Sequence, residues 1–354
     1  MGIFLSYLVL FFSLAGPLTG SLTDNFLHTN EQQYNPEKIF YMSHSKEKEG
    51  IASLEKNADK IDILATQFYG NSDKLELVGG LDAQLKKAIA QVQGGQNKIK
   101  VMPLVTNANF SQDVVHNFLL SSDAQNVAIN SLVNIAKKDN YVGWQFDFEN
   151  INYLDKDLYS TFVEKSAKSL KENGLILSIA AVSRSVDYED TDSFKNWGGA
   201  FDYARLAKAA DFISLMAYDD PNSVGPVASL PFINKVLNYV KDKIPPEKLS
   251  FGVPLYYWCW CTDTSKKVET SGAYDGLLYI KSQFPHDLGF DDALGAAWLT
   301  YLYQDKQYRV WYQDQQSFGN KLDIVKQNNF RGFSAWVLGV EDPQIWSVLA
   351  ENKE

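Results

Sequence analysis

Two carboxylates and an amide alternate with large apolar residues in the segment 141–151, and these polar residues are well suited to acid–base chemistry. The polar positions are Gln145, Asp147 and Glu149, and the apolar positions around them are Trp144, Phe146, Phe148 and Ile151. Alternation at every second position is the period of a β-strand whose two faces differ. The three polar side chains are therefore expected to point the same way.

The acidic face of this strand is expected to look into a polar cavity. Burying unpaired carboxylates in an apolar core costs several kcal/mol or forces them to take up protons. Two alternatives stand beside a functional site: the acids lie on the solvent side of a surface strand, or they pair with buried arginines. An edge strand rarely sets large aromatic residues against a compact acidic row, which favours the functional site.

Short apolar runs recur along the chain and alternate with amphipathic helical patterns. The predicted strands are 39–45, 61–69, 99–106, 142–149, 175–182, 212–218, 249–256 and 332–337, and the predicted helices include 124–138, 158–173, 203–210 and 232–243. Eight such units predict an α/β fold, a (β/α)8 TIM barrel with right-handed crossovers. The alternative is an open doubly wound sheet, but residues 45–50 do not form the Gly-rich phosphate turn of a Rossmann fold.

The stretch between the last two predicted strands, 257–331, is longer than one helix and two loops require. Within it, 272–280 and 308–313 resemble short strands and 291–298 resembles a helix. We expect a small α+β insertion over residues 257–315, on the C-terminal rim of the barrel, where it would form one wall of a cleft.

The composition favours an uncharged partner. The 354 residues include 33 Lys and Arg against 43 Asp and Glu, which gives a net charge of -10. Such a chain is not expected to bind nucleic acid or an anionic membrane surface. The 8 Trp and 19 Tyr are consistent with stacking against sugar rings, although most such residues serve a core. A neutral substrate is therefore expected, and the oligomeric state is left open.

Residues 1–20 are typical of a secretory signal peptide. Residues 3–15 are almost wholly apolar, and Pro17 and small residues follow them. The apolar stretch is shorter than the roughly 20 residues that a membrane span needs, so no stable membrane insertion is expected. An uncleaved anchor is the alternative. We expect a barrel domain over residues 21–354 that is secreted, periplasmic or part of the cell envelope.

Cys259 and Cys261 are the two cysteines of the chain. On an extended strand they face the same way, but a bridge across one residue is strained, so a disulfide and two thiols are both open. The four His show no spacing typical of a metal site. We expect no metal and no cofactor.

Several motifs together carry a family resemblance. Residues 143–149 resemble the DxxDxDxE signature on the fourth strand of glycoside hydrolase family 18, the chitinase-type barrels, and residues 215–219 resemble that family's Met-x-Tyr-Asp on strand six. Trp336 stands where the family keeps a Trp beneath the sugar. Segments 101–105, 225–231, 252–256 and 338–342 are similar to the bacterial branch related to spore-germination and peptidoglycan hydrolases. The family also carries an α+β insertion after strand seven.

The resemblance implies a secreted retaining glycosidase that cleaves β-1,4-linked N-acetylglucosamine glycans by substrate-assisted catalysis. Glu149 would protonate the leaving oxygen, and Asp147 would orient the acetamido group and offset the charge of an oxazolinium intermediate. Tyr218 would bind the acetamido carbonyl. The expected catalytic residues are therefore Glu149, Asp147 and Tyr218, and the expected substrate-binding residues are Gln145, Met216, Asp219 and Trp336. Met216 could equally fill a core.

The chain departs from the family signature at two positions. Val142 replaces its first Asp, where we expect a structural effect only. Gln145 replaces its middle Asp, and a neutral Gln cannot share a proton with Asp147. We therefore predict that Gln145 donates a hydrogen bond to an ionised Asp147 and that the acid limb of the pH profile is altered. The variant Gln145→Asp tests this, because an unchanged limb would contradict it.

Two other functions remain open at this stage. A carbohydrate-binding lectin on the same barrel is one, although lectin-type relatives typically lose the final Glu that stands here as Glu149. A hydrolase with an ordinary carboxylate pair is the other, with Asp187 or Asp219 as its second acid. Chitin and peptidoglycan are both open as substrates, as are endo and exo action.

Overall fold

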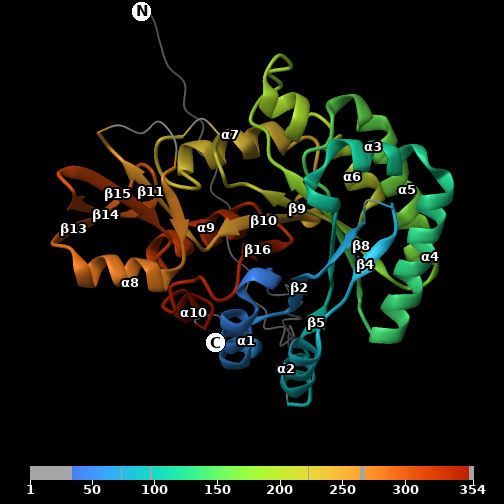
Figure 1. The fold of residues 1–354 in the computed structure, drawn as a ribbon, viewed down its shortest axis with the longest axis horizontal. Coiled ribbons are helices and arrows are strands. Elements are labelled where there is room, and N and C mark those ends of the chain that lie inside the picture. The colour runs from blue at the N-terminus through green and yellow to red at the C-terminus, as the bar shows by residue number, and fades with distance from the viewer. Residues whose placement is uncertain (1–33, 73, 96–97, 222, 264–267, 351–354) are drawn as a thin grey trace, which may run out of the picture. The chain divides into compact units, whose positions relative to one another are not determined.

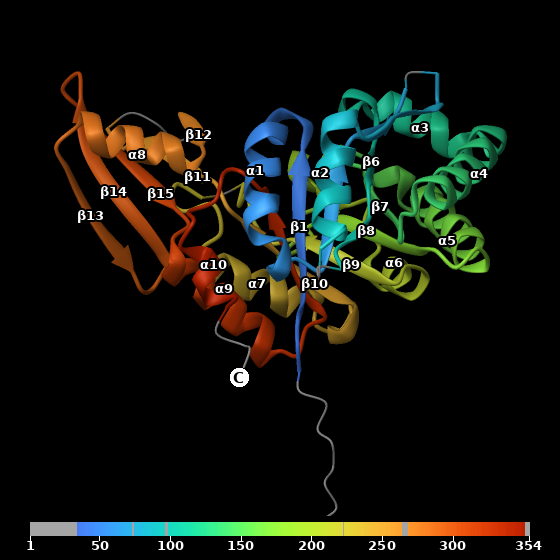
Figure 2. The same ribbon diagram turned by 90° about the horizontal axis from the view of Figure 1, so that it is seen from below.

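A parallel barrel forms the centre of the computed structural model, which describes residues 34–350 apart from 73, 96–97, 222 and 264–267 (Figures 1 and 2). The predicted signal peptide lies outside the described residues. The barrel strands are β1 (Glu37–Ser43), β2 (Ile63–Gln67), β3 (Tyr69–Asn71), β5 (Lys100–Val101), β6 (Leu104–Thr106), β7 (Gly143–Asp147), β8 (Ile176–Val182), β9 (Phe212–Met216), β10 (Leu249–Pro254) and β16 (Gly332–Trp336). Each predicted strand coincides with one of these strands or with a consecutive pair of them.

The segment 100–106 closes the barrel. Its first half, β5, pairs with β2, and its second half, β6, pairs with β7, so one stretch of chain joins both ends of the parallel sheet. Pro103 separates the halves because it has no N–H to donate, while its carbonyl accepts a hydrogen bond from the Gln145 N–H at 2.9 Å. The short strand β4 (Leu77–Gly79) runs antiparallel beside β3. The expected barrel is confirmed, and the open doubly wound sheet is wrong.

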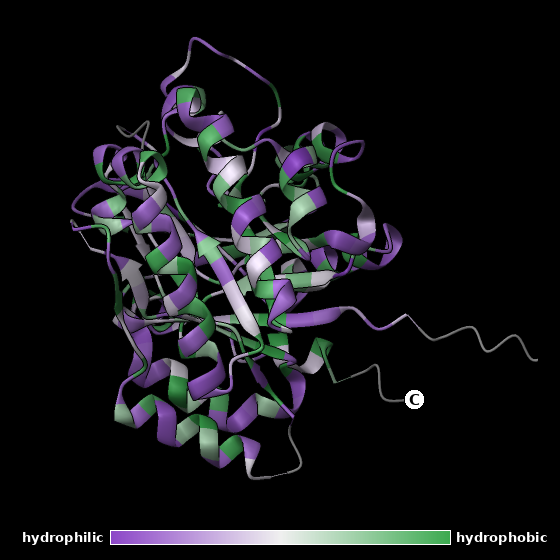
Figure 3. Cartoon of the chain, turned by 90° about the vertical axis from the view of Figure 1, so that its right-hand side faces the viewer, coloured by the Kyte–Doolittle hydropathy of each residue, from purple (hydrophilic) through white to green (hydrophobic). Residues whose placement is uncertain are grey.

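Helices pack around the outside of the barrel (Figure 2). They are α1 (Glu47–Asn57), α2 (Ala83–Gln93), α3 (Gln112–Leu120), α4 (Ser122–Asp139), α5 (Lys156–Glu172), α6 (Tyr203–Ala209), α7 (Leu230–Val240), α9 (Gln315–Gln327) and α10 (Ile345–Val348). The helices in Figure 3 carry both hydrophilic and hydrophobic residues along their length, as amphipathic helices do. The four helices expected from the sequence are confirmed.

The aromatic face of β7 packs outward against these helices. The ring of Phe146 stacks on Phe162 of α5 with centroids 5.1 Å apart, and the indole N–H of Trp144 donates to the Leu132 carbonyl of α4 at 2.9 Å. Since successive side chains of a strand alternate, the polar side chains of β7 point into the barrel. The sequence prediction of two unlike faces is confirmed.

A second, antiparallel sheet lies between β10 and β16. It contains β11 (Tyr257–Cys261), β12 (Thr270–Gly272), β13 (His286–Asp291), β14 (Ala296–Tyr303) and β15 (Lys306–Tyr312), in the order β12-β11-β15-β14-β13. Helix α8 (Tyr274–Gln283) packs on one face of this sheet through Leu277 and Ile280. The predicted α+β insertion is confirmed, as is its strand at 308–313.

Two of the elements expected inside the insertion are wrong. The segment 272–280 is mostly helix α8, because Leu277 and Ile280 are buried at a spacing of three residues. The segment 291–298 is a hairpin rather than a helix: Asp291 ends β13, Gly295 turns with a φ of 63°, and β14 follows. A left-handed glycine in a tight turn explains the reversal of the chain.

Cys259 and Cys261 are both buried in the insertion and do not form a disulfide. Among the described residues, no helix is long and apolar enough to cross a membrane.

Candidate active site

The carboxyl end of β7 places Asp147 and Glu149 at the mouth of the barrel. Asp147 is the last residue of the strand and is 4% exposed, whereas Glu149 lies two residues further on and is partly exposed. Catalytic groups of barrel enzymes are found at this end of the strands. The structure therefore brings the two acids to the expected face, with Glu149 nearer the solvent.

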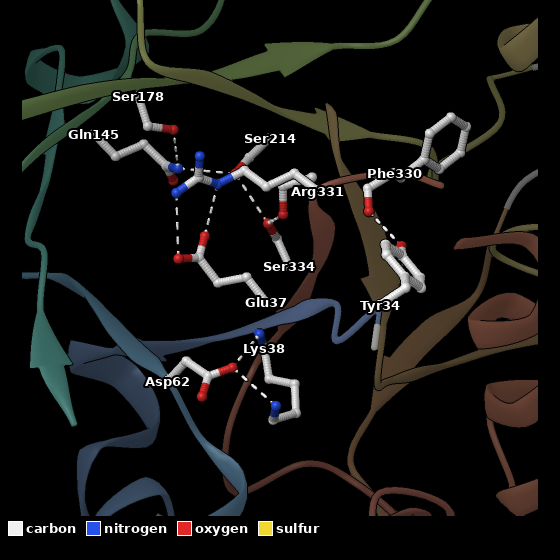
Figure 4. A network of polar contacts seen from close by, with 11 residues as sticks. Tyr34, Glu37, Lys38, Asp62, Gln145, Ser178, Ser214, Phe330, Arg331 and Ser334 are labelled. Atoms are coloured by element: carbon white, nitrogen blue, oxygen red, sulfur yellow. Dashed lines mark hydrogen bonds and ion pairs between the residues drawn. The ribbon is translucent and has the colours of Figure 1, made fainter. Parts of the chain in front are cut away.

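Gln145 lies one strand period below Asp147 and is fully buried in a polar layer that crosses the barrel (Figure 4). Its amide N–H groups donate to Ser178 Oγ at 2.8 Å and Ser214 Oγ at 2.9 Å, and its Oε1 accepts from the Tyr41 hydroxyl at 2.8 Å. Ser334 extends the layer, with its Oγ 2.9 Å from Ser214 Oγ. The prediction that Gln145 donates to Asp147 is wrong, because both amide hydrogens are engaged by serines on other strands.

Asp147 is held by a different amide. Burial raises the pKa of the Asp147 carboxyl above its usual range, and a hydrogen bond with Gln67 at the end of β2 counteracts part of that rise. The predicted ionised state of Asp147 therefore has less support from its surroundings than that of an exposed carboxyl. The physical reason is that Gln145 supplies no hydrogen bond to stabilise its charge, and the carboxyl is shielded from water.

The carboxyl of Glu149 forms no hydrogen bond or ion pair with any residue in the described part of the chain. Burial raises the pKa of Glu149, and the neighbouring carboxyls of Asp147 and Asp219 raise it further. A negative charge on a neighbouring carboxyl disfavours a second negative charge on Glu149. Glu149 therefore keeps its proton to a higher pH than an isolated carboxyl does. A carboxyl that keeps its proton near neutral pH is suited to act as a general acid.

Tyr218 and Asp219 lie beside this pair, just beyond the end of β9. Burial and the surrounding acids raise the pKa of Tyr218 well above its usual range, so its hydroxyl remains a hydrogen-bond donor. Asp219 has a left-handed backbone with a φ of 58° and accepts a hydrogen bond from the Tyr256 hydroxyl. Desolvation in the cleft raises the pKa of Asp219, and the bond from Tyr256 opposes that rise. Both predicted residues therefore face Glu149.

Asp187 does not belong to the site. Its carboxylate forms an ion pair with Arg184 at 3.1 Å and accepts hydrogen bonds from the Tyr239 hydroxyl at 2.6 and 2.7 Å. It anchors the loop after β8 instead of facing the substrate. Of the two second acids considered for an ordinary carboxylate pair, the structure brings only Asp219 near Glu149.

A cleft runs across the mouth of the barrel in two hollows that meet at Asp219, each of about 510 Å³. We call one the Glu149 half; its lining includes Glu149, Asp192, Trp197, Met216, Tyr218 and Pro221. We call the other the Trp336 half; its lining includes Ser43, Lys46, Tyr256, Trp258, Ser271 and Trp336. The insertion contributes Trp258 and Ser271 and so forms a wall of the cleft, as the sequence predicted. Met216 lines the cleft instead of filling the core.

Four residues that sequence reasoning missed complete the site. Tyr41 supports Trp336, with ring centroids 5.3 Å apart, in addition to its bond to Gln145. Gln67 contacts Asp147, Tyr256 contacts Asp219, and Asn107 contacts the backbone of Glu149. Tyr256 and Asn107 stand at or just beyond the carboxyl ends of predicted strands, and Gln67 stands two residues before such an end. Polar residues at those positions are the signal that could have identified them.

The arrangement suits proton transfer to a bound sugar. It combines a partly exposed acid with a raised pKa, a shielded carboxylate behind it, a tyrosine donor and an indole in the adjoining half of the cleft. Within the described residues, no group of three or more His, Cys, Asp or Glu side chains is placed to hold a metal ion.

Comparison with solved structures shows the same fold in known barrels. A chitinase from Chromobacterium violaceum ATCC 12472 superposes with a TM-score of 0.79 at 23% identity, over 90% of this chain and 98% of that one. The spore cortex-lytic enzyme SleL of Bacillus megaterium QM B1551 also gives a TM-score of 0.79, over 90% of this chain and 74% of that one, at 23% identity.

Sequence relatives include bacterial glycosylases. The uncharacterized glycosylase YvbX of Bacillus subtilis (strain 168) is 26% identical over 311 residues, covering 85% of this chain and 87% of the relative. The cortical fragment-lytic enzyme of Bacillus anthracis is 25% identical over 276 residues, covering 75% of this chain and 62% of that enzyme. The sequence model of the glycosyl hydrolases of family 18 matches residues 30–341. The chain is thus a glycosidase and belongs to glycosyl hydrolase family 18.

Proposed function

We propose that this chain hydrolyses β-1,4 bonds of N-acetylglucosamine glycans by substrate-assisted catalysis with retention of configuration. The observation that carries the proposal is the shielding of Asp147, which is 4% exposed beneath the raised-pKa acid Glu149. An enzyme nucleophile must reach the sugar from a carboxylate about 5 Å from the acid, whereas substrate-assisted enzymes use the 2-acetamido oxygen of the sugar. A shielded Asp147 suits the second role.

Each step can be assigned to a side chain of the cleft. Glu149 donates its proton to the bridging oxygen while the acetamido oxygen attacks the anomeric carbon, so the glycosidic bond breaks and an oxazolinium ion forms. Asp147 accepts a hydrogen bond from the acetamido N–H and offsets the positive charge. Tyr218 donates to the acetamido oxygen, and Trp336 packs beneath the ring. Water then opens the oxazolinium ion, and Glu149 takes the proton back.

Asp219 and Met216 complete the proposed binding surface. Asp219 borders both halves of the cleft and Met216 lines the Glu149 half, so both would contact the substrate near the cleaved bond. Gln145 is fully buried, and we propose that it supports the site from below instead of touching sugar.

The substrate is proposed to be chitin or the glycan strand of peptidoglycan. The names of the relatives are consistent with both substrates, since they include cortical fragment-lytic enzymes and a class V chitinase. We also propose export to the cell surface or beyond, on the strength of the apolar segment 3–15. The fusion of residues 1–30 to a reporter, with assay of the culture medium, tests export directly.

Product analysis tests the proposed reaction. The full chain, or the chain from residue 21, is incubated with chitooligosaccharides and with purified peptidoglycan, and the products are identified by mass spectrometry. Replacing Glu149 by Gln should lower kcat by roughly 100- to 10,000-fold, since general acid catalysis typically contributes that much, while sugar binding is retained. A thiazoline analogue of the oxazolinium ion should inhibit the unaltered enzyme.

Two outcomes would contradict the proposal. If the Glu149→Gln variant keeps its activity, another group donates the proton. If neither glycan gives a product but both bind, the barrel is a lectin despite the presence of Glu149.

A further inference from the structure

The side chain of Asn107 contacts the backbone of Glu149 twice. Its Oδ1 accepts from the Glu149 N–H at 2.9 Å, and its Nδ2 donates to the Glu149 carbonyl at 2.9 Å. Asn107 is only 2% exposed, so the two bonds are shielded from competing water. A single residue thus holds both polar groups of the Glu149 backbone.

These bonds continue the β6–β7 pairing beyond the end of the strands. The parallel ladder pairs Leu104 with Gln145 and ends at the pair of Thr106 and Asp147. Glu149 lies past this end, where no further strand–strand register is formed. The amide of Asn107 supplies one donor and one acceptor, which is what a neighbouring strand would supply.

The next residue, Asn150, is anchored through its own side chain. It has a left-handed backbone with a φ of 55°, and its Nδ2 donates to the Phe110 carbonyl at 2.8 Å. The Gln112 amide donates to Asn150 Oδ1 and to Asn196 Oδ1, both at 3.1 Å. The turn that follows Glu149 is therefore tied to the segment after β6 and to the short helix Phe194–Gly198, which carries Trp197.

We propose that Asn107 is a positioning residue of the active site, whose amide fixes the Glu149 backbone and so aims the carboxyl at the bridging oxygen of the glycan. The inference rests on the proposed role of Glu149 as proton donor. The carboxyl itself has no hydrogen-bonding partner among the described residues, so its direction depends on how the backbone is held. A misplacement of about 1 Å can lower a rate 100-fold.

The geometry also bears on the acidity of Glu149. Burial and two nearby carboxyls raise the pKa of Glu149, and both effects depend on the carboxyl staying where it is. If the backbone is released, the carboxyl can move toward water and away from Asp147. Its pKa would then fall, and the alkaline limb of activity would move to lower pH.

The test compares Asn107→Ala with Asn107→Asp in the full chain, on whichever of chitooligosaccharides or purified peptidoglycan the unaltered protein cleaves faster. We expect Asn107→Ala to lower kcat by roughly 10- to 100-fold with little change in KM, and to move the alkaline limb to lower pH. Asn107→Asp keeps the shape of the side chain but adds a charge, so kcat should also fall while the limb moves to higher pH.

Gln125→Ala is the matched control for a merely structural role. Gln125 is another buried amide, 8% exposed, and donates to the Leu119 carbonyl at 2.7 Å on the helical layer. Its loss should lower Tm without moving the pH limb. If Asn107→Ala lowers Tm in the same way but leaves kcat and the limb unchanged, the proposal is overturned.

Two further results separate this inference from the function on which it rests. If the Asn107→Ala variant does not fold, the isosteric Asn107→Asp variant alone tests the proposal. An unchanged kcat in the Asn107→Asp variant then overturns it. An active Glu149→Gln variant would instead refute the proposed function.

Discussion

The acidity of Glu149 depends on two carboxyls that belong to different strand ends. Asp147 stands behind it on β7, and Asp219 faces it from beyond β9. Asp147 would touch the substrate, so its replacement would confuse charge with binding. Asp219 also borders the proposed substrate, but its own hydrogen bond runs to Tyr256 and not to Glu149. The position of the pH limb, rather than the size of kcat/KM, therefore reports its effect on the acidity of Glu149.

Asp219→Asn is predicted to move the alkaline limb of kcat/KM to lower pH. Activity requires protonated Glu149, and removal of the neighbouring negative charge lowers the pKa of Glu149. The fraction of enzyme molecules with a protonated Glu149 therefore begins to fall at a lower pH. The measurement is a pH profile of kcat/KM at constant ionic strength.

Asp187→Asn serves as the control for Asp219→Asn. It removes one negative charge from the same rim, but that charge is paired with Arg184 at 3.1 Å. Its alkaline limb should coincide with that of the unaltered enzyme. An equal shift in both variants would mean that net charge, and not the position of Asp219, sets the acidity of Glu149.

At the scale of elements, the polar layer under the site ties several strands together. Gln145 of β7 bonds to Ser178 of β8 and to Ser214 of β9 (Figure 4). It also accepts a hydrogen bond from Tyr41 of β1. An amide suits this place because it offers two donors and an acceptor at once. An aspartate at position 145 can only accept hydrogen bonds from these hydroxyls and buries a negative charge, which gives a structural reason for Gln at this departure from the family signature.

Gln145→Leu is predicted to destabilise the fold by about 3 kcal/mol, because each buried polar group left without a partner costs about 1–3 kcal/mol. The matched control is Gln313→Leu. Gln313 is also buried, at 3% exposure, but its amide has no hydrogen-bonding partner among the described residues. Its replacement should change the free energy of unfolding by less than about 1 kcal/mol. Urea unfolding of the two variants gives both values, and equal losses would contradict a stabilising polar layer.

The sequence predicted the strands of the barrel better than the contacts inside it. A buried parallel strand is a short apolar run, which can be recognised without knowing its neighbours. The partners of Gln145 are 33, 69 and 104 residues away along the chain, so no local pattern could reveal that its amide faces serines instead of Asp147. The prediction that Gln145 alters the acid limb of the pH profile stays a prediction, and Gln145→Asp still tests it.

The secondary structure of the insertion was predicted less accurately than that of the barrel, for a different reason. Segment 272–280 mixes tyrosines, glycines and leucines, which suit a short strand as well as a helix that buries Leu277 and Ile280. The sheet against which α8 packs is assembled from residues on both sides of it in the chain. Tertiary packing therefore decided between the two forms.

At the scale of the whole molecule, charge is distributed unevenly along the cleft. The chain carries a net charge of -10, and the acids Asp192 and Asp219 border the Glu149 half beside the protonated Glu149. Among the described residues that line either half, Lys46 is the one basic side chain, and it lies in the Trp336 half. A sugar that carries a carboxylate, as in peptidoglycan, would be repelled from the first half and attracted to the second. A neutral chitin chain would be neither repelled from the first half nor attracted to the second.

Lys46→Glu should therefore raise KM for peptidoglycan fragments and leave KM for chitooligosaccharides unchanged. An exposed ion pair contributes up to about 1 kcal/mol, so reversal of the charge is expected to raise KM roughly threefold to tenfold at low salt. Screening at about 1 M salt should remove the difference. Lys48→Glu is the matched control, because it makes the same change in net charge at an exposed position two residues away that does not line the cleft. If both variants raise KM for peptidoglycan equally, the overall charge of the molecule governs the encounter; if neither does, Lys46 does not select the substrate.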